Sequence, residues 1–126
     1  MNKEPIILVS ALSGFLAVAL GAFGAHGLKD ILEPNLYTVY QTGVEYQFYH
    51  TLALLFIAVA PTRFCEKRLG WAAIAFIVGM LLFSGSLYLL ALTGIRALGV
   101  ITPIGGVAFL CGWLLIAYTA YYSNRR

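Results

Sequence analysis

The chain of 126 residues has little charge: Asp, Glu, Lys and Arg make up 10% of it, whereas 61% of its residues are hydrophobic. A soluble domain carries about 25% charged residues. A soluble domain of this length could not bury so much apolar surface. The shortage of charge therefore excludes a soluble globular domain. It predicts an integral membrane protein in which one membrane domain occupies residues 1–126.

Cysteines and catalytic motifs are also scarce. The two cysteines are Cys65, in a short basic loop, and Cys111, in an apolar run. Neither belongs to a C-x-x-C or C-x-x-C-H motif, so we predict structural thiols and no disulfide. The sequence has no serine–histidine–acid set, no Walker loop and no paired carboxylates inside an apolar segment. We therefore predict that the protein is not an enzyme.

Ligands for a cofactor are equally few. His26 and His50 could ligate a haem or a metal, but no third ligand stands at metal spacing. We predict no cofactor and a hydrogen-bonded structural role for each histidine, with a haem or redox module as the least favoured alternative. The net charge of +3 does not indicate a nucleic acid partner, because the basic residues stand at the ends of apolar segments rather than on one face.

The chain is rich instead in long apolar segments. A helix needs roughly 20 residues to cross a bilayer. The run from Ile6 to Ala25 has no charge and is too long for the apolar part of a signal peptide. We predict an all-α integral membrane protein built as a bundle of four transmembrane helices. The helices are expected at about residues 5–27, 35–60, 69–94 and 101–123.

The distribution of basic residues predicts the orientation of the bundle. With the N-terminus in the cytoplasm, only Lys29 and Arg96 lie on the outer side. The inner side then carries Lys3, Arg63, Lys67, Arg68, Arg125 and Arg126. Cytoplasmic loops carry an excess of Lys and Arg. Both termini of this multi-pass membrane protein are therefore predicted to be cytoplasmic.

The second apolar segment differs from the others because polar and aromatic residues fill its first half. Its wholly apolar part, Leu52–Ala60, is too short to cross a bilayer. Counting back about 20 residues from Ala60 reaches Gln41, so Glu45, Gln47 and His50 are expected at or below the membrane surface. Ionisable groups at such depth are costly and need partners.

Two polar stripes run along this second helix. Thr38, Gln41, Glu45 and Tyr49 share one stripe by their i+3 and i+4 spacing, and Gly43, Gln47 and His50 share another. Glu45 has no basic residue four positions away, so we predict an ion pair with Arg96, in the turn between helices three and four on the same outer side. The pair has two interpretations: a structural link, or a substrate or proton site.

Small residues recur at helical spacing in the other segments. Such stripes allow close helix packing, which is more common than the alternative, a pore lining. The residues predicted to pack helices are Gly14, Ala17, Gly21, Gly79, Ser86, Gly105 and Gly112.

Three stretches together carry a resemblance to a known family. They are Gly21–His26, Gln41–Gln47 with His50–Ala53, and Leu82–Tyr88 with Thr102–Gly106. The chain resembles the YgdD-like small inner-membrane proteins, the domain of unknown function 423. The resemblance implies a four-helix protein of bacterial plasma membranes and no assigned activity. Its motif residues correspond to His26, Gln41, Glu45, Gln47, His50, Ser84, Tyr88, Arg96 and Pro103.

Function is therefore a choice between hypotheses. The favoured one is a non-enzymatic scaffold or accessory subunit, acting as a homo-oligomer or in a larger membrane complex. It rests on the argument that one bundle cannot use every small-residue stripe internally. The alternative is an oligomeric small-molecule or proton-coupled transporter or channel that uses Glu45.

Overall fold

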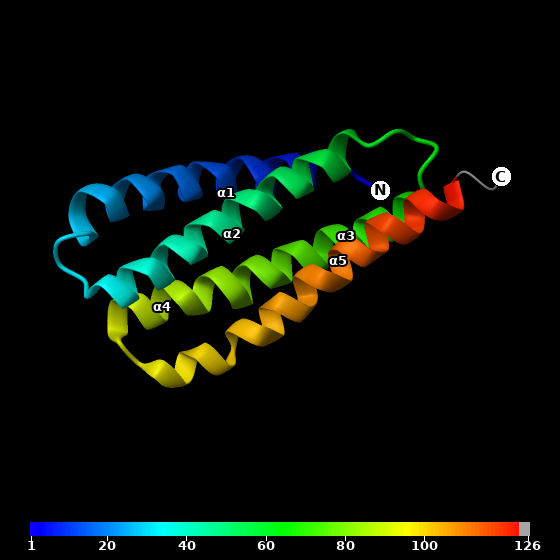
Figure 1. Cartoon of the computed structure of the whole chain (residues 1–126). Helices are drawn as coiled ribbons and strands as arrows, with labels where there is room; N and C mark the ends of the chain where they lie inside the picture. The colour runs from blue at the N-terminus through cyan, green and yellow to red at the C-terminus, as the bar shows by residue number, and fades with distance from the viewer. Residues whose placement is uncertain (124–126) are drawn as a thin grey trace.

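The computed structural model describes residues 1–123, and this part of the chain contains helices and no strands. Arg125 and Arg126, two of the predicted cytoplasmic basic residues, lie outside it. The helices form long segments that run up and down a common axis (Figure 1). In chain order they are α1 (Glu4–Phe23) with η1 (Gly24–Leu28), α2 (Pro34–Val59), α3 (Glu66–Gly79) with η2 (Met80–Ser84) and α4 (Gly85–Thr93), and η3 (Arg96–Val100) with α5 (Thr102–Ser123).

Proline and glycine set most of the helix ends. Pro34 is the first residue of α2, a position where its missing N–H costs nothing. Pro61 follows the last residues of α2, and Gly94 ends α4 in the left-handed conformation with φ 72°. The third segment begins at Glu66, three residues before its predicted start at 69, because the charged turn Glu66–Arg68 is already helical.

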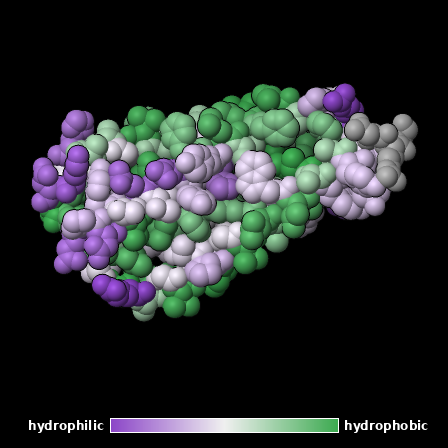
Figure 2. Space-filling model, viewed as in Figure 1, coloured by the Kyte–Doolittle hydropathy of each residue, from purple (hydrophilic) through white to green (hydrophobic). Residues whose placement is uncertain are grey.

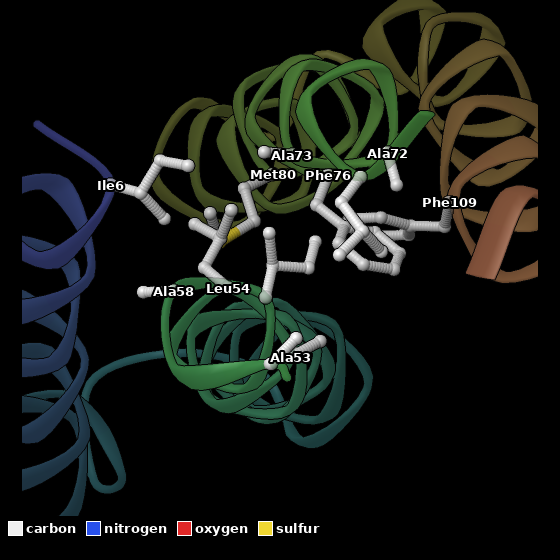
Figure 3. Packing of buried hydrophobic residues seen from close by; sticks show 12 residues of the cluster. Ile6, Ala53, Leu54, Ala58, Ala72, Ala73, Phe76, Met80 and Phe109 are labelled. Atoms are coloured by element: carbon white, nitrogen blue, oxygen red, sulfur yellow. The ribbon is translucent and has the colours of Figure 1, made fainter. Parts of the chain in front are cut away.

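The segments pack as two pairs joined through α2. Helix α1 lies along α2, and α5 lies along α3 and η2. Helix α2 also packs against η2 and α4, so it is in contact with both pairs. Figure 3 shows the apolar core between them, to which α2 contributes Leu54, α3 contributes Phe76 and α5 contributes Phe109. Leu54 and Phe76 are fully buried.

Glycines of the second pair lie directly under aromatic rings. A Cβ added at Gly79 would stand 2.5 Å from Cε1 of Phe109, and one at Gly112 would stand 2.5 Å from Cε1 of Phe76. At Gly105 it would meet the backbone of Phe83, 2.8 Å from its Cα. The small residues of α3 and α5 are therefore used inside the chain. This contradicts the argument that one bundle leaves these stripes free for other chains.

The remaining small residues also face their own bundle. Ala17 of α1 is 1% exposed, and the nearest neighbour of a Cβ at Gly14 would be Cγ2 of Thr51 at 3.5 Å. A Cβ at Gly21 would lie 3.4 Å from Cγ1 of Val44. Ser86 hydrogen-bonds Thr102 across the turn between α4 and α5, with 2.6 Å between the two hydroxyl oxygens.

The outer surface is apolar along the body of the bundle. Figure 2 shows hydrophobic side chains over most of the visible face and hydrophilic ones gathered mainly at its two ends. Within residues 1–123, three segments are long and apolar enough to cross a membrane: Glu4–Leu28, Glu66–Thr93 and Arg96–Ser123. Helix α2 is as long, but the polar residues of its first half lower its hydropathy.

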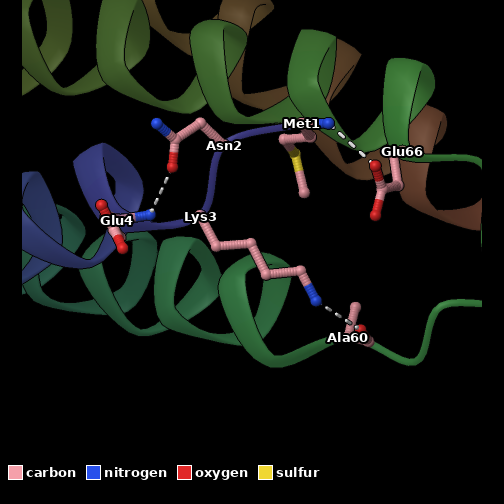
Figure 4. A network of polar contacts seen from close by, with 6 residues as sticks. All are labelled: Met1, Asn2, Lys3, Glu4, Ala60 and Glu66. Carbon is pink, nitrogen blue, oxygen red and sulfur yellow. Dashed lines mark hydrogen bonds and ion pairs between the residues drawn. The ribbon is translucent and has the colours of Figure 1, made fainter.

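The end of the bundle that holds the N-terminus is fastened by polar contacts. The amino group of Met1 lies 2.8 Å from Oε2 of Glu66, and Nζ of Lys3 donates to the carbonyl oxygen of Ala60 at 3.5 Å (Figure 4). These contacts join the start of α1 to the start of α3 and the end of α2. Met1–Glu66 is the one ion pair found among residues 1–123.

Candidate functional site

The two polar stripes of α2 face opposite environments. Thr38, Gln41, Glu45 and Tyr49 are exposed on the outside of the bundle, whereas Gly43, Gln47 and His50 are buried inside it. The helical period separates the stripes but does not tell which one faces inward. The structure therefore divides the predicted polar cluster into an internal network and an external row, which we call the α2 row: Gln41, Glu45 and Tyr49.

Gln47 is the centre of the internal network. Its side chain is 8% exposed, and its Nε2 donates to the carbonyl oxygen of Ser13 at 3.0 Å. The hydroxyl of Tyr88 donates to its Oε1 at 2.5 Å. Gln47 thus connects α1 to α4 with both ends of its amide.

Hydroxyl groups extend the network to the neighbouring turns. Thr51 donates to the carbonyl oxygen of Gln47 at 2.7 Å, so Thr51 accepts the hydroxyl proton of Ser13, 2.7 Å away. Ser84 donates to the carbonyl oxygen of Gly43 at 2.7 Å. No buried polar side-chain atom in the described part of the chain lacks a hydrogen-bond partner. The network holds α1, α2 and α4 in one register.

His50 connects α2 to α5. Its Nδ1 lies 2.7 Å from the carbonyl oxygen of Tyr46, which can only accept, so Nδ1 carries the proton. Its Nε2 accepts the indole N–H of Trp113 at 3.1 Å. The ring stacks on Phe109, with 3.6 Å between centroids and 8° between planes. Both ring nitrogens are occupied, so a metal would have to displace Trp113.

The structure does not bring the two histidines together. Gly14 of α1 faces Thr51, and Gly24 of η1 faces Tyr40. His50 is therefore level with position 14, twelve residues from His26, which is about 18 Å at 1.5 Å per residue. His26 is exposed in η1, and no group of three potential metal ligands occurs among residues 1–123. This geometry does not fit one haem held by both histidines.

The predicted ion pair between Glu45 and Arg96 is wrong for the described chain. Both side chains are exposed, and they form no ion pair with each other. Glu45 and Gln41 line a small hollow of about 150 Å³ beside Gly21 of α1. Arg96 lies at the start of η3, beside α4 and α5. Helix α2 turns Glu45 toward the side where α1 packs, which separates it from that turn.

A larger groove of about 440 Å³ lies between α1 and the η2–α4 segment. Leu12 and Leu16 of α1 form one wall, Leu81 and Gly85 form the other, and Gln47 of α2 lies between them. A Cβ added at Gly85 would meet no atom within 4 Å. The polar atoms of Gln47 at this groove are already hydrogen-bonded, so its free surface is apolar.

Several residues of the network and of the groove were not predicted from the sequence. Ser13 and Thr51 are polar residues in apolar surroundings, a signal that could have selected them. Trp113 and Gly85 carry no comparable signal, because tryptophan and glycine are both frequent in membrane helices.

Comparison with known proteins identifies the chain's relatives. Residues 20–106 match the family model described as "Protein of unknown function (DUF423)". The chain belongs to the DUF423 family. This DUF423 protein is 44% identical over 126 residues to the UPF0382 inner membrane protein YgdD of Escherichia coli K12, covering 100% of this chain and 96% of that protein.

Other bacteria also hold relatives of this DUF423 protein. A UPF0382 membrane protein of Haemophilus influenzae is 46% identical over 122 residues, 97% of this chain and 98% of its own. The membrane protein SH2409 of Staphylococcus haemolyticus is 44% identical over 115 residues, 91% and 93% of the two chains. No solved structure matches the chain. The DUF423 protein is an integral protein of the bacterial plasma membrane, in a family without an assigned activity.

Proposed function

We propose that this DUF423 protein is a non-enzymatic, four-span scaffold or accessory subunit that works as a homo-oligomer. The α2 row, Gln41, Glu45 and Tyr49, is the observation that carries the proposal. The internal network uses its polar atoms within one chain, whereas the α2 row is exposed on the outside of the bundle.

The four-span topology supports this arrangement. Helix α2 has 26 residues, about 39 Å at 1.5 Å per residue, which exceeds the roughly 30 Å of the hydrocarbon core. Its buried polar side chains are hydrogen-bonded inside the bundle, so they do not oppose insertion. The N-terminus and the end of α5 lie at the same end as the basic loop Arg63–Arg68 (Figure 1). Because cytoplasmic loops carry an excess of positive charge, this arrangement supports cytoplasmic termini.

In that topology Glu45 lies inside the hydrocarbon. Gly21 of α1 faces Val44, so Glu45 is level with the neighbourhood of Gly21. The uncharged run Ile6–Ala25 has its middle about 8 Å from Gly21 at 1.5 Å per residue. The half-thickness of the core is about 15 Å, which puts Glu45 roughly 7 Å below its surface.

A carboxyl group at that depth is too costly to leave facing lipid, so something must cover it. Intramembrane acids face the interior of a bundle or a water-filled cavity. A second copy offers what is needed at the same depth, because its Gln41 amide both donates and accepts and lies one helical turn from its own Glu45. The α2 rows of two copies are therefore self-complementary in a two-fold symmetric interface.

Energy transfer between fluorescently labelled copies in liposomes tests the interface. Glu45→Leu makes the row apolar, so we expect self-association to be lost. Glu33→Leu, which removes an acid from the loop before α2, should leave it unchanged. If Glu45→Leu associates as the wild type does, or if the wild type is monomeric, the α2 row is not the interface.

Reporter fusions after Arg68 and Arg126 test the topology separately. Both are expected to report from the cytoplasm. A signal from the outside at either position would rule out four spans with cytoplasmic termini.

A second candidate function follows from the depth of Glu45. Several copies around one axis would bring their carboxyl groups together, as an oligomeric proton-coupled transporter or channel requires. Proton flux into liposomes that contain the protein distinguishes the two functions. Flux that Glu45→Gln abolishes would favour transport, whereas self-association without flux favours the scaffold.

A further inference from the structure

A second hollow lies at the end of the bundle that carries the basic loop. It has a volume of about 140 Å³ and lies between the loop that joins α2 to α3 and the last turn of α5. Arg63 and Arg68 line it together with hydroxyl-bearing side chains. Those side chains are Thr62, Thr119, Tyr122 and Ser123.

Aromatic rings hold the two arginines in place. The guanidinium of Arg63 lies 5.3 Å from the ring centroid of Phe64, and that of Arg68 lies 5.0 Å from the ring of Tyr118. A guanidinium on an aromatic face keeps its edge N–H groups free to bind oxygen atoms. Both guanidinium groups can therefore donate hydrogen bonds to a ligand in the hollow.

The acid of the same loop does not neutralise these arginines. Glu66 is turned away and pairs with the amino group of Met1 (Figure 4). Neither Arg63 nor Arg68 forms an ion pair within residues 1–123. The hollow thus presents two positive charges and several hydroxyls, which match the oxygens of a phosphate group.

An apolar hollow continues from the basic one toward the body of the bundle. The two hollows share Phe64 and Thr119. The other residues that line the apolar hollow are Phe56, Leu69, Ile116 and Ala120. These residues lie in α2, α3 and α5, further from the polar end of the bundle than Arg63 and Ser123. A basic, hydroxyl-rich hollow followed by an apolar one has the polarity of a phospholipid.

We propose that this site binds the phosphate headgroup of an anionic phospholipid, with the start of an acyl chain lying against the small apolar hollow of about 30 Å³. Basic pockets between membrane helices recognise such headgroups. The same guanidinium chemistry would also hold free phosphate, but the adjoining apolar hollow and the position at the polar end of the bundle favour the lipid. The site uses neither the α2 row nor the self-association inferred above.

Binding of phosphatidylglycerol by the intact protein in mixed detergent micelles tests the site. The double variant Arg63→Gln with Arg68→Gln should bind phosphatidylglycerol about 25-fold more weakly, because each basic residue near an anionic lipid contributes a factor of about five. Phosphatidylcholine, which has no net charge, should bind equally weakly to both proteins. The control Lys29→Gln with Arg96→Gln removes the same charge from the opposite end and should bind as the wild type does.

Four outcomes would overturn the proposal. Wild-type binding by the arginine variant would overturn it. A loss of binding in the control as large as in the arginine variant would also overturn it, since equal losses mean general charge attraction. Inorganic phosphate alone must not raise the thermal stability as much as phosphatidylglycerol does, since that identifies a free-anion site. If the double variant does not fold, Arg68→Lys keeps the charge but loses the forked geometry, and unchanged binding of that variant contradicts the site.

Discussion

The α1–α2 seam and the α3–α5 seam are held together in different ways. Between α3 and α5, rings of Phe76 and Phe109 lie on Gly112 and Gly79 so closely that no Cβ fits. Between α1 and α2, Gly14 leaves ordinary contact distance to Thr51, and the link is the hydrogen bonding of Gln47 to Ser13. The α3–α5 seam is sensitive to size around Phe76 and Phe109, whereas the α1–α2 seam is sensitive to polarity around Ser13 and Gln47. Substitutions that change one property at a time should separate them.

The largest effect is expected at Gly105. An alanine Cβ would overlap the backbone of Phe83, which cannot move without shifting the whole helix. We expect Gly105→Ala to cost about 3 kcal/mol, the upper part of the range for overpacking. Gly14→Ala in the other seam, where the added Cβ finds ordinary contact, should change stability by less than about 1 kcal/mol. Unfolding in detergent measures both, and equal losses would remove the distinction between the seams.

Gln47→Leu tests the polar seam. The substitution preserves most of the side-chain volume but leaves the carbonyl oxygen of Ser13 and the hydroxyl of Tyr88 without their partner. We expect a loss of about 2 kcal/mol, typical of buried polar groups that lose a hydrogen bond. Adding Tyr88→Phe should recover part of the loss. A double variant no better than Gln47→Leu alone would show that Tyr88 does not depend on Gln47.

Trp113→Phe tests the hydrogen bond that crosses from one pair to the other. It removes the N–H that His50 accepts but keeps a ring beside Phe76. The expected loss is about 1 kcal/mol, because hydrogen bonds between membrane helices contribute about 0.6–1.7 kcal/mol. Nitrogen NMR of the wild type should find the proton of His50 on Nδ1. A proton on Nε2 would contradict the assigned hydrogen bond.

The smallest effect, and the one of opposite sign, is expected at Gly85. This glycine has no neighbour in the chain that an alanine Cβ would touch. Gly85→Ala should therefore stabilise the protein by about 0.5 kcal/mol, because alanine loses less backbone freedom on folding. The measurement is the same unfolding in detergent, and a clear loss would show that something covers the groove between α1 and η2–α4.

The sequence was sufficient to predict helix ends, because these depend on residues at the ends themselves. Pro34, Pro61 and Gly94 limit helices wherever the helices pack, so the ends of the segments could be placed within a few residues. The same holds for the length of each apolar run. Orientation about the helix axis is different, because it depends on which neighbours the folded chain supplies.

Glu45 and Gln47 illustrate that limit. Two residues apart on one helix, they lie on different faces, and the sequence suggested that the charged one needed an internal partner. The folded chain buries the neutral amide, whose two ends are satisfied by Ser13 and Tyr88, and leaves the acid outside. Such partners depend on how far one helix is shifted along its neighbour. A single sequence does not reveal that shift.

The π-helical turn η2 constrains how the length of this helix can change during evolution. Such a turn holds one residue more than an α-helical turn, and one residue advances the helix by about 100°. Phe76 and Gly79 before it meet α5, whereas Ser84 at its end and Tyr88 after it meet α2. Loss of a single codon within Met80–Ser84 would rotate everything that follows in this helix by about 100° and turn Tyr88 away from Gln47. A lineage can therefore replace residues in this helix one by one, but it cannot shorten this turn by one residue and keep the same bundle.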